Sequence, residues 1–196
     1  MAADASRDAA IVREVEQWLV RAVIGLNLCP FARSVHVKRQ IAYRVSHATD
    51  PEAVLADLSL AFDTLEATDP AAIDTLLLIL PDGFDDFLAF NDMLGLSERL
   101  LKRLRLRGVF QIATFHPDYQ FAGAGPDDIE NYTNRAPYPI LHLLREDSVT
   151  RAVDGFPDPD AIYTRNQARL RALGHAGWHD LMNAPEDGAD VGQAPR

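Results

Sequence analysis

The chain has 196 residues, enough for a sizeable core, and 47% of them are hydrophobic, as in a globular protein and unlike a disordered one. A formal net charge of −10 argues against a general affinity for nucleic acid or anionic membranes, because phosphate groups bind to basic surfaces. One cysteine excludes an intrachain disulfide, and the first residues lack the basic start and apolar run of a signal peptide. We therefore expect a cytoplasmic protein without a membrane partner.

The first half of the chain alternates between predicted helices and strands. Residues 8–27 have the apolar spacing of an amphipathic helix. Residues 35–47 alternate in polarity, which predicts a strand. The Thr-Asp-Pro-Glu run at 49–52 opens a helix with a capping side chain and a proline in the first turn. Residues 73–80 are almost all apolar, as in a central strand that is covered on both faces.

The second half continues the alternation. Residues 84–107 are predicted to form a helix that is bent or broken near Gly95. Strands are predicted at 108–116 and 140–145, followed by a last helix at 159–173. This order implies an α/β or α+β domain in which helices pack on a sheet of about four or five strands, with a ferredoxin-like variant among the candidates.

The domain boundaries follow from composition. No linker or repeat divides the chain, so residues 1–181 are expected to form one globular domain. The segment 182–196 is small and polar, which predicts a disordered tail.

Cys29 is the first candidate for chemistry. If a helix begins at Pro30, the thiol caps its amide end, which would lower the thiol pKa and make Cys29 a nucleophile or redox thiol. Arg33 would lie one turn further on and assist. The alternative is a small buried hydrophobic residue at a helix junction.

His116 is the second candidate, because it ends a predicted strand and Pro117 turns the chain at the rim of the sheet. His116 could be a general base, with Asp118 orienting it, or the two could bind a metal ion. In the alternative interpretation, Asp118 caps backbone amides in a turn and His116 is half-exposed.

The segment that follows is polar and rich in proline, which is typical of a loop that a scaffold presents for recognition. Arg135 could clamp a carboxylate or phosphate, or form a structural ion pair. His142 is either a core residue or a partner of His116, if their strands are neighbours. Asp128 caps a helical turn or contributes to a cation site. The other candidate ligand-binding residues of this segment are Gln120, Asn131, Tyr132 and Asn134.

Three stretches carry a resemblance to a known family: GLNLCPFA at 25–32, QIATFHPDYQF at 111–121 and DIENYTNRAPYPILHLLRE at 128–146. On these residues the chain resembles a bacterial family catalogued as domain of unknown function 1415. The resemblance implies that the three stretches form one signature, and it implies no activity, substrate or cofactor.

Three hypotheses remain open. The leading one is a small enzyme acting on a polar small molecule or peptide, with an anionic one favoured, in which Cys29 is the nucleophile, His116 the base and Arg135 the anion clamp. The second is a metal-dependent enzyme that uses His116 and Asp118, with His142 or Asp128. The third is a binding module in which Arg135 and neighbouring tyrosines form a recognition surface. The residues identify no particular cofactor and no oligomeric state.

Overall fold

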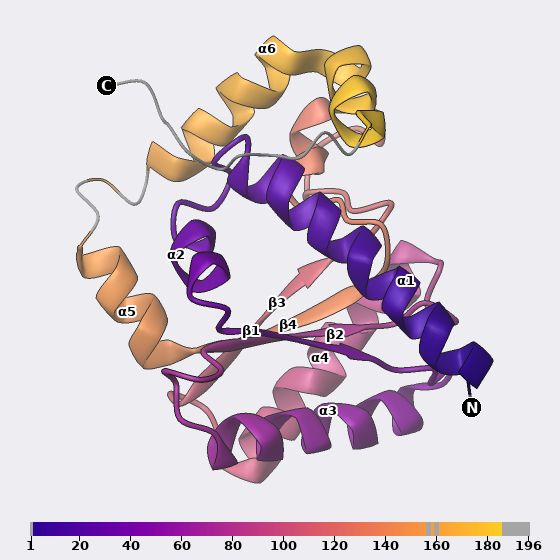
Figure 1. The fold of residues 1–196 in the computed structure, drawn as a ribbon, viewed down its shortest axis with the longest axis vertical. Coiled ribbons are helices and arrows are strands. Elements are labelled where there is room, and N and C mark those ends of the chain that lie inside the picture. Colours follow the sequence, from indigo (N-terminus) through magenta and orange to yellow (C-terminus); the bar gives the residue numbers. More distant parts are fainter. Residues whose placement is uncertain (1, 156–157, 159–160, 186–196) are drawn as a thin grey trace.

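A four-stranded mixed sheet forms the centre of the protein (Figure 1). A computed structural model describes residues 2–155, 158 and 161–185. The strands are β1 (Ile41–Val45), β2 (Thr75–Ile79), β3 (Phe110–Phe115) and β4 (Ile140–Arg145). Their order in the sheet is β1-β2-β4-β3, with β1 and β2 parallel and β4 antiparallel to both of its neighbours.

Helices cover both faces of this sheet. Two of them, α3 (Pro51–Ala67) and α4 (Phe87–Leu104), lie on one face. On the other face lie α1 (Ala2–Trp18), its π-helical continuation η1 (Leu19–Ile24), α2 (Ala32–Val37) and α5 (Glu146–Asp154). The last helix, α6 (Ala161–Asn183), packs outside this layer, together with the 3₁₀-helix η2 (Ile129–Thr133).

The architecture confirms the predicted fold class: it is an α+β structure with one open sheet of four strands. The parallel pair β1 and β2 is joined by α3, as a crossover connection requires. From β1 to β4, the order of strands and α-helices along the chain is βαβαββ, which differs from the βαββαβ order of ferredoxin-like domains.

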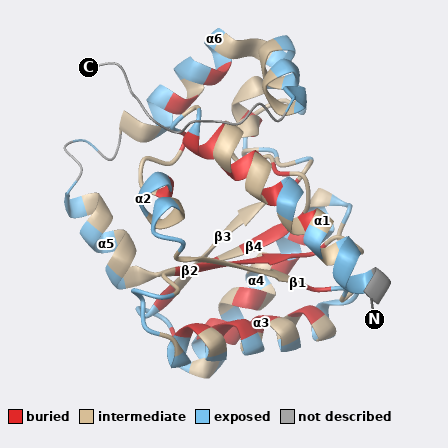
Figure 2. Cartoon of the chain, viewed as in Figure 1, coloured by how far each residue is buried: buried red, intermediate tan, exposed pale blue. Residues whose placement is uncertain are grey.

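Strand alternation divides the core into two clusters. Leu76, Leu78 and Leu141 point toward α3 and α4, whereas Leu77 and Ile79 point toward α1. In Figure 2 the buried residues accordingly follow the sheet and the inner sides of the helices that flank it.

Helix starts agree with their local sequence. The side chain of Asp50 accepts a hydrogen bond from the amide of Ala53, at 3.0 Å, as predicted for the first residues of α3. Asp86 caps α4 in the same way through the amide of Ala89. Helix α4 is continuous through Gly95, so the helix is not broken there.

Other boundaries also differ from the prediction. The strand expected at 35–47 is confined to β1, because its first three residues end α2. The helix α5 had no counterpart in the sequence prediction, and α6 extends past the predicted boundary at residue 181. Most of the predicted tail, residues 186–196, lies outside the described residues. None of the helices that the structure describes has both the length and the apolar character needed to cross a bilayer.

Candidate ligand-binding pocket

A cavity of about 850 Å³ lies on the sheet face that carries α1 and α2. We call it the sheet pocket. Part of η1, the turn before α2, and α5 surround it, and the sheet forms its floor. The apolar lining residues include Trp18, Leu19, Val23, Phe31, Val35, Leu77, Phe115, Leu144, Val149 and Ala152.

The register of the sheet determines which side chains form the floor. Thr75 is opposite Leu144, which is opposite Gln111. In the next row, Leu77, His142 and Ala113 are neighbours across three strands. Residues that alternate along a strand share a face, so these two rows lie together beneath the pocket.

Cys29 contributes the thiol of this pocket, and its side chain is partly exposed. Burial raises the thiol pKa, while the backbone amides of Phe31 and Ala32, which donate hydrogen bonds to the sulfur, oppose that shift. Burial is the larger effect, so the pKa is raised. Helix α2 begins at Ala32 and its N-cap residue is Phe31, so Cys29 does not occupy the predicted cap position. The predicted lowering of its pKa is not observed either.

The turn that carries Cys29 is fastened by α6. Buried Asn166 donates a hydrogen bond from Nδ2 to the carbonyl of Leu28, at 2.8 Å. Arg169 donates to the carbonyls of Leu26 and Asn27. The position of the thiol therefore depends on a helix that follows it by more than a hundred residues.

His142 contributes the imidazole of the pocket floor. Its Nε2 lies 2.7 Å from Oγ1 of Thr75, and its ring centroid lies 5.9 Å from that of Phe115. The ring keeps some exposed surface because it lines the pocket, but protein surrounds it closely. Desolvation by this burial lowers the pKa of His142 to about 4, so the imidazole is neutral near pH 7.

Polar groups gather at the rim of the pocket. Ser148 on α5 donates a hydrogen bond to Asp74, at 2.6 Å, and Arg151 donates to the Ser148 hydroxyl, at 2.9 Å. Lys38 lies at the same rim and is exposed. The rim therefore presents both signs of charge around a mainly apolar interior.

His116 lies on the opposite face of the sheet and does not line the pocket. It is fully buried between Phe87 and Phe90, with ring centroids at 5.4 and 5.2 Å. Its Nε2 donates to the carbonyl of Phe84, at 2.9 Å, and its Nδ1 accepts from the amide of Asp118, also at 2.9 Å. Both ring nitrogens are thus occupied, and the ring fixes the backbone of two loops.

The reason for this separation is the period of two along a strand. His116 continues the row of Ile112 and Thr114, which faces α4, whereas His142 is opposite Ala113, which faces the pocket. The strands are neighbours, as the shared-site hypothesis required, but the two imidazoles point to opposite sides.

Arg135 is held by its own loop. Its Nε donates to the carbonyl of Tyr119 and its Nη2 to that of Pro126, while its guanidinium carbon lies 4.5 Å from the ring centroid of Tyr132. Buried Asn131 bridges the amide of Phe121 and the carbonyl of Gly125. These contacts stabilise the loop.

The remaining predicted residues also lie away from the pocket. Asn134 donates to the carbonyl of Thr114, and Gln120 donates to that of Ala124. Asp128 is the N-cap residue of η2, but its side chain accepts from the preceding amide of Gly125 and makes no capping hydrogen bond to the helix. Arg33 is exposed on α2 and does not line the pocket. Of the predicted site residues, the structure brings only Cys29 and His142 to one cavity.

The described residues include no group of three His, Cys, Asp or Glu side chains arranged to hold a metal ion. In particular, His116 and His142 are separated by the sheet. The side chains of His116, Asp118 and His142, which the metal hypothesis combined, therefore do not converge on one point.

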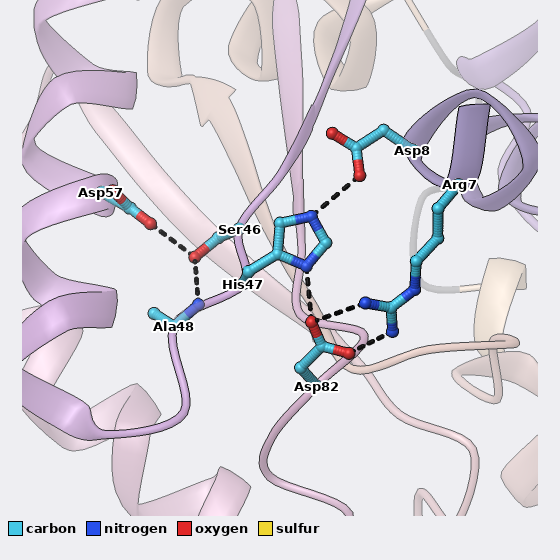
Figure 3. A network of polar contacts seen from close by, with 7 residues as sticks. All are labelled: Arg7, Asp8, Ser46, His47, Ala48, Asp57 and Asp82. Carbon is cyan, nitrogen blue, oxygen red and sulfur yellow. Dashed lines mark hydrogen bonds and ion pairs between the residues drawn. The ribbon is translucent and has the colours of Figure 1, made fainter. Parts of the chain in front are cut away.

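A second polar cluster, which the sequence did not indicate, lies beyond the ends of β1 and β2 (Figure 3). His47 lies between Asp8 of α1 and Asp82, and Arg7 also pairs with Asp82. The two carboxylates raise the pKa of His47, and the partners Arg7 and His47 lower the pKa of Asp82. All four side chains retain exposed surface, so the cluster is an ion-pair tether for α1 at the molecular surface.

Thr75 and Gln111 are pocket residues that the sequence analysis missed. Thr75 is the first residue of β2, and Gln111 is the second residue of β3. Polar residues are frequent near strand ends for structural reasons, so the sequence contains no signal that separates Thr75 and Gln111 from ordinary residues at the edge of a sheet. The alternation within each strand is the only available clue.

Comparison with known protein families gives one match. A family model described as a protein of unknown function (DUF1415) matches residues 10–180. The chain belongs to this family. The matched range includes both Cys29 and His142. No curated protein and no solved structure matches the chain.

Proposed function

We propose that this protein binds a small, mainly apolar molecule in the sheet pocket. The observation that carries the proposal is the cavity of about 850 Å³ over a part of the sheet that α1 leaves uncovered. Small-molecule sites typically have volumes of about 300–1,000 Å³, an apolar lining and a few placed polar groups. The lining supports a ligand with a hydrocarbon body, in place of the polar anion that the sequence favoured. The charged rim supports a polar substituent near the entrance.

Binding of the neutral fluorophore N-phenyl-1-naphthylamine, whose emission rises in apolar surroundings, tests the proposal. Ala113→Phe adds a ring on the pocket floor, and Ala56→Phe adds the same ring on the exposed side of α3. We expect saturable binding to the native protein and to Ala56→Phe, and at least about tenfold weaker binding to Ala113→Phe, because the added ring occupies the cavity. Equal affinities for all three proteins would exclude the sheet pocket as the binding site.

A second candidate function is thiol chemistry within the same pocket. It is supported by the position of Cys29 and His142 on one cavity, in which His142 replaces His116 as the imidazole that shares a pocket with the thiol. In this proposal, the Cys29 thiol adds across the carbon–carbon double bond of an α,β-unsaturated carbonyl ligand. The sulfur–carbon bond forms at the β-carbon as the π bond breaks, and the thiol proton passes to the α-carbon, so no group leaves. A free thiol of this kind fits a reducing compartment such as the cytoplasm.

Alkylation of Cys29 by iodoacetamide tests this second candidate. Because Cys29 lines the pocket, saturating N-phenyl-1-naphthylamine should slow the alkylation. An unchanged alkylation rate, under conditions where the fluorophore is bound, would remove Cys29 from the ligand site.

A further inference from the structure

We propose that the ligand of the sheet pocket is a neutral molecule whose hydroxyl or N–H group donates a hydrogen bond to Nδ1 of His142. This inference rests on the proposed binding function, and it names the polar group that the ligand must carry.

The position of the imidazole proton follows from Thr75. Its Oγ1 lies 2.6 Å from the carbonyl oxygen of Leu143 and 2.7 Å from Nε2 of His142. A carbonyl oxygen can only accept, so the single hydroxyl proton of Thr75 is directed to Leu143. The contact with His142 therefore requires a proton on Nε2, which donates to the threonine oxygen. In a neutral imidazole, Nδ1 is then an unprotonated acceptor.

Nδ1 has no hydrogen-bond partner among the described residues, because the hydrogen bond of this ring is the one to Thr75. Among the described residues, the Tyr43 hydroxyl is the only fully buried side-chain oxygen or nitrogen without a hydrogen-bond partner. Nδ1 of His142 also lacks a partner but is not fully buried, since His142 lines the pocket. The acceptor is consequently available to a molecule inside the cavity.

The surroundings of the ring determine what kind of group can use this acceptor. Leu77, Ala113 and Leu144 flank His142 on the floor, and Phe115 lies beside it. The low pKa of His142 keeps the ring uncharged near pH 7, so it offers no positive charge to an anion. A carboxylate or phosphate at this position would face a lone pair and lose its hydration. A hydroxyl or N–H donor would instead complete the one open hydrogen bond in an apolar setting.

A matched pair of ligands tests the inference. The hydroxyl group of 2-naphthol can donate a hydrogen bond, whereas 2-methylnaphthalene has nearly the same shape and cannot. Their dissociation constants are measured by calorimetry with the native protein and with His142→Leu. The readout is the ratio of the two constants within each protein, because this ratio cancels the general apolar contribution of the ring system.

We expect the preference for 2-naphthol to fall about five- to tenfold in His142→Leu, which corresponds to one neutral hydrogen bond. The hydrogen bond from Thr75 to Leu143 does not involve His142 and should persist in this variant. His179→Leu, a change at an exposed histidine of α6, is the matched control and should leave the ratio unchanged.

The imidazole tautomer is measured directly by nitrogen–proton NMR on the native protein labelled uniformly with ¹⁵N. This measurement does not depend on whether a substituted protein folds. A proton on Nε2 of His142 is expected, and a proton on Nδ1 would overturn the inference. An equal ligand ratio in native protein and His142→Leu would also overturn it, while the binding function would stand. If neither naphthalene bound the native protein, the proposed function would fail, and the inference would fail with it.

Discussion

At the scale of single residues, His116 and His142 show how neighbours decide what an imidazole can do. Both belong to adjacent strands or their ends, and both are enclosed by protein. His116 uses its two nitrogens to hold the backbone at Phe84 and Asp118. His142 uses one nitrogen and presents the other to a cavity. The first is a structural residue and the second is available for a ligand.

Replacing His116 by alanine should therefore affect stability. We expect His116→Ala to lower the free energy of unfolding by about 3 kcal/mol, because it removes a buried ring and leaves two backbone groups without partners. Urea denaturation measures this loss, and His179→Ala, at an exposed position, should change stability by less than about 0.5 kcal/mol. Folded His116→Ala should still bind N-phenyl-1-naphthylamine with native affinity. A loss of binding without a loss of stability would favour the site role predicted from sequence.

The thiol of Cys29 gives a prediction at the same scale. Because burial raises its pKa, the thiolate fraction at neutral pH is smaller than that of a free thiol. We expect iodoacetamide to alkylate Cys29 more slowly than it alkylates glutathione at neutral pH. As the pH is raised, the rate for Cys29 should continue to increase above the pH at which the rate for glutathione becomes constant. Alkylation faster than that of glutathione would instead support the activated thiol expected from the sequence.

Sequence reasoning named Cys29 and His142 as candidates, but it could not show that they share a cavity while His116 and Arg135 do not line it. His116 and Arg135 occur in a segment of polar and angular composition, and the partners that occupy them are backbone carbonyls and amides. Composition does not reveal such partners. The cluster around His47 was missed for the opposite reason, because its members are far apart in the chain and each looks unremarkable alone.

At the scale of elements, the π-helical segment η1 is the feature that shapes the upper wall of the pocket. Leu19 and Val23 belong to it, and both line the cavity. The amide of Gly25 donates to the carbonyl of Val20, five residues earlier, at 2.9 Å. A Cβ at Gly25 would lie 2.2 Å from the carbonyl oxygen of Arg21, so only glycine allows the backbone to close in this way.

Two glycine substitutions test this assignment. Gly25→Ala should reduce the free energy of unfolding by about 1–3 kcal/mol, because the methyl group collides with backbone. Gly95→Ala, in the exposed middle of α4, meets nothing closer than 3.7 Å and should stabilise the protein by about 1 kcal/mol. Thermal unfolding compares the two variants. Stabilisation by both would show that residues 19–25 form an ordinary α-helix.

The elements that sequence predicted best are those with strong local patterns. The apolar run of β2, the pattern of β4 and the Asp-Pro start of α3 were all recognised. The strand predicted at 35–47 began too early, because Val35, His36 and Val37 alternate in polarity as in a strand but form the end of α2. The π-helical register of η1 was not expected, because the apolar spacing of 8–27 suits an α-helix.

At the scale of the whole molecule, the pocket depends on contacts between distant parts of the chain. Asn166 and Arg169 of α6 hold the carbonyls of the turn before Cys29. This arrangement was not predictable, since nothing in the local sequence of either segment identifies the other. It also explains how a short turn with Asn27 at a φ of 51° is kept in one conformation.

Asn166→Ala should release this turn. We expect the free energy of unfolding to fall by about 1–3 kcal/mol, because the buried carbonyl of Leu28 loses its donor. Alkylation of Cys29 should also become faster, as the thiol is held less firmly within the protein. Thr164→Ala, at an exposed position of the same helix, is the control. Unchanged alkylation in a destabilised Asn166→Ala would show that the turn keeps its position without α6.

The tether of α1 at His47 should make stability depend on pH. Both nitrogens of His47 face carboxylates, so both contacts are complete only in the imidazolium form. The pKa of His47 is raised on folding, so its contribution is fully present below the unfolded value of about 6.5 and is lost as pH rises through the folded value. Asp82 has a lowered pKa, so its contribution is lost instead as pH falls through its folded value.

We therefore expect the native protein to lose a small amount of stability between about pH 6 and 8, and His47→Gln to lose less over the same range. Urea denaturation at several pH values measures the difference. Because the cluster is exposed, added salt should reduce the effect. Identical pH profiles for native protein and His47→Gln would show that the tether contributes nothing.

The strand order β1-β2-β4-β3 has a consequence for how the protein is made. The last strand to be synthesised, β4, lies between β2 and β3, which emerge from the ribosome earlier. Strand β4 carries His142 on one face and core leucines on the other. Until residue 145 has left the exit tunnel, β2 and β3 have no neighbour on their facing edges. Nascent chains shorter than this should remain protease-sensitive and open to chaperones, and the cavity should close only in the final stage of synthesis.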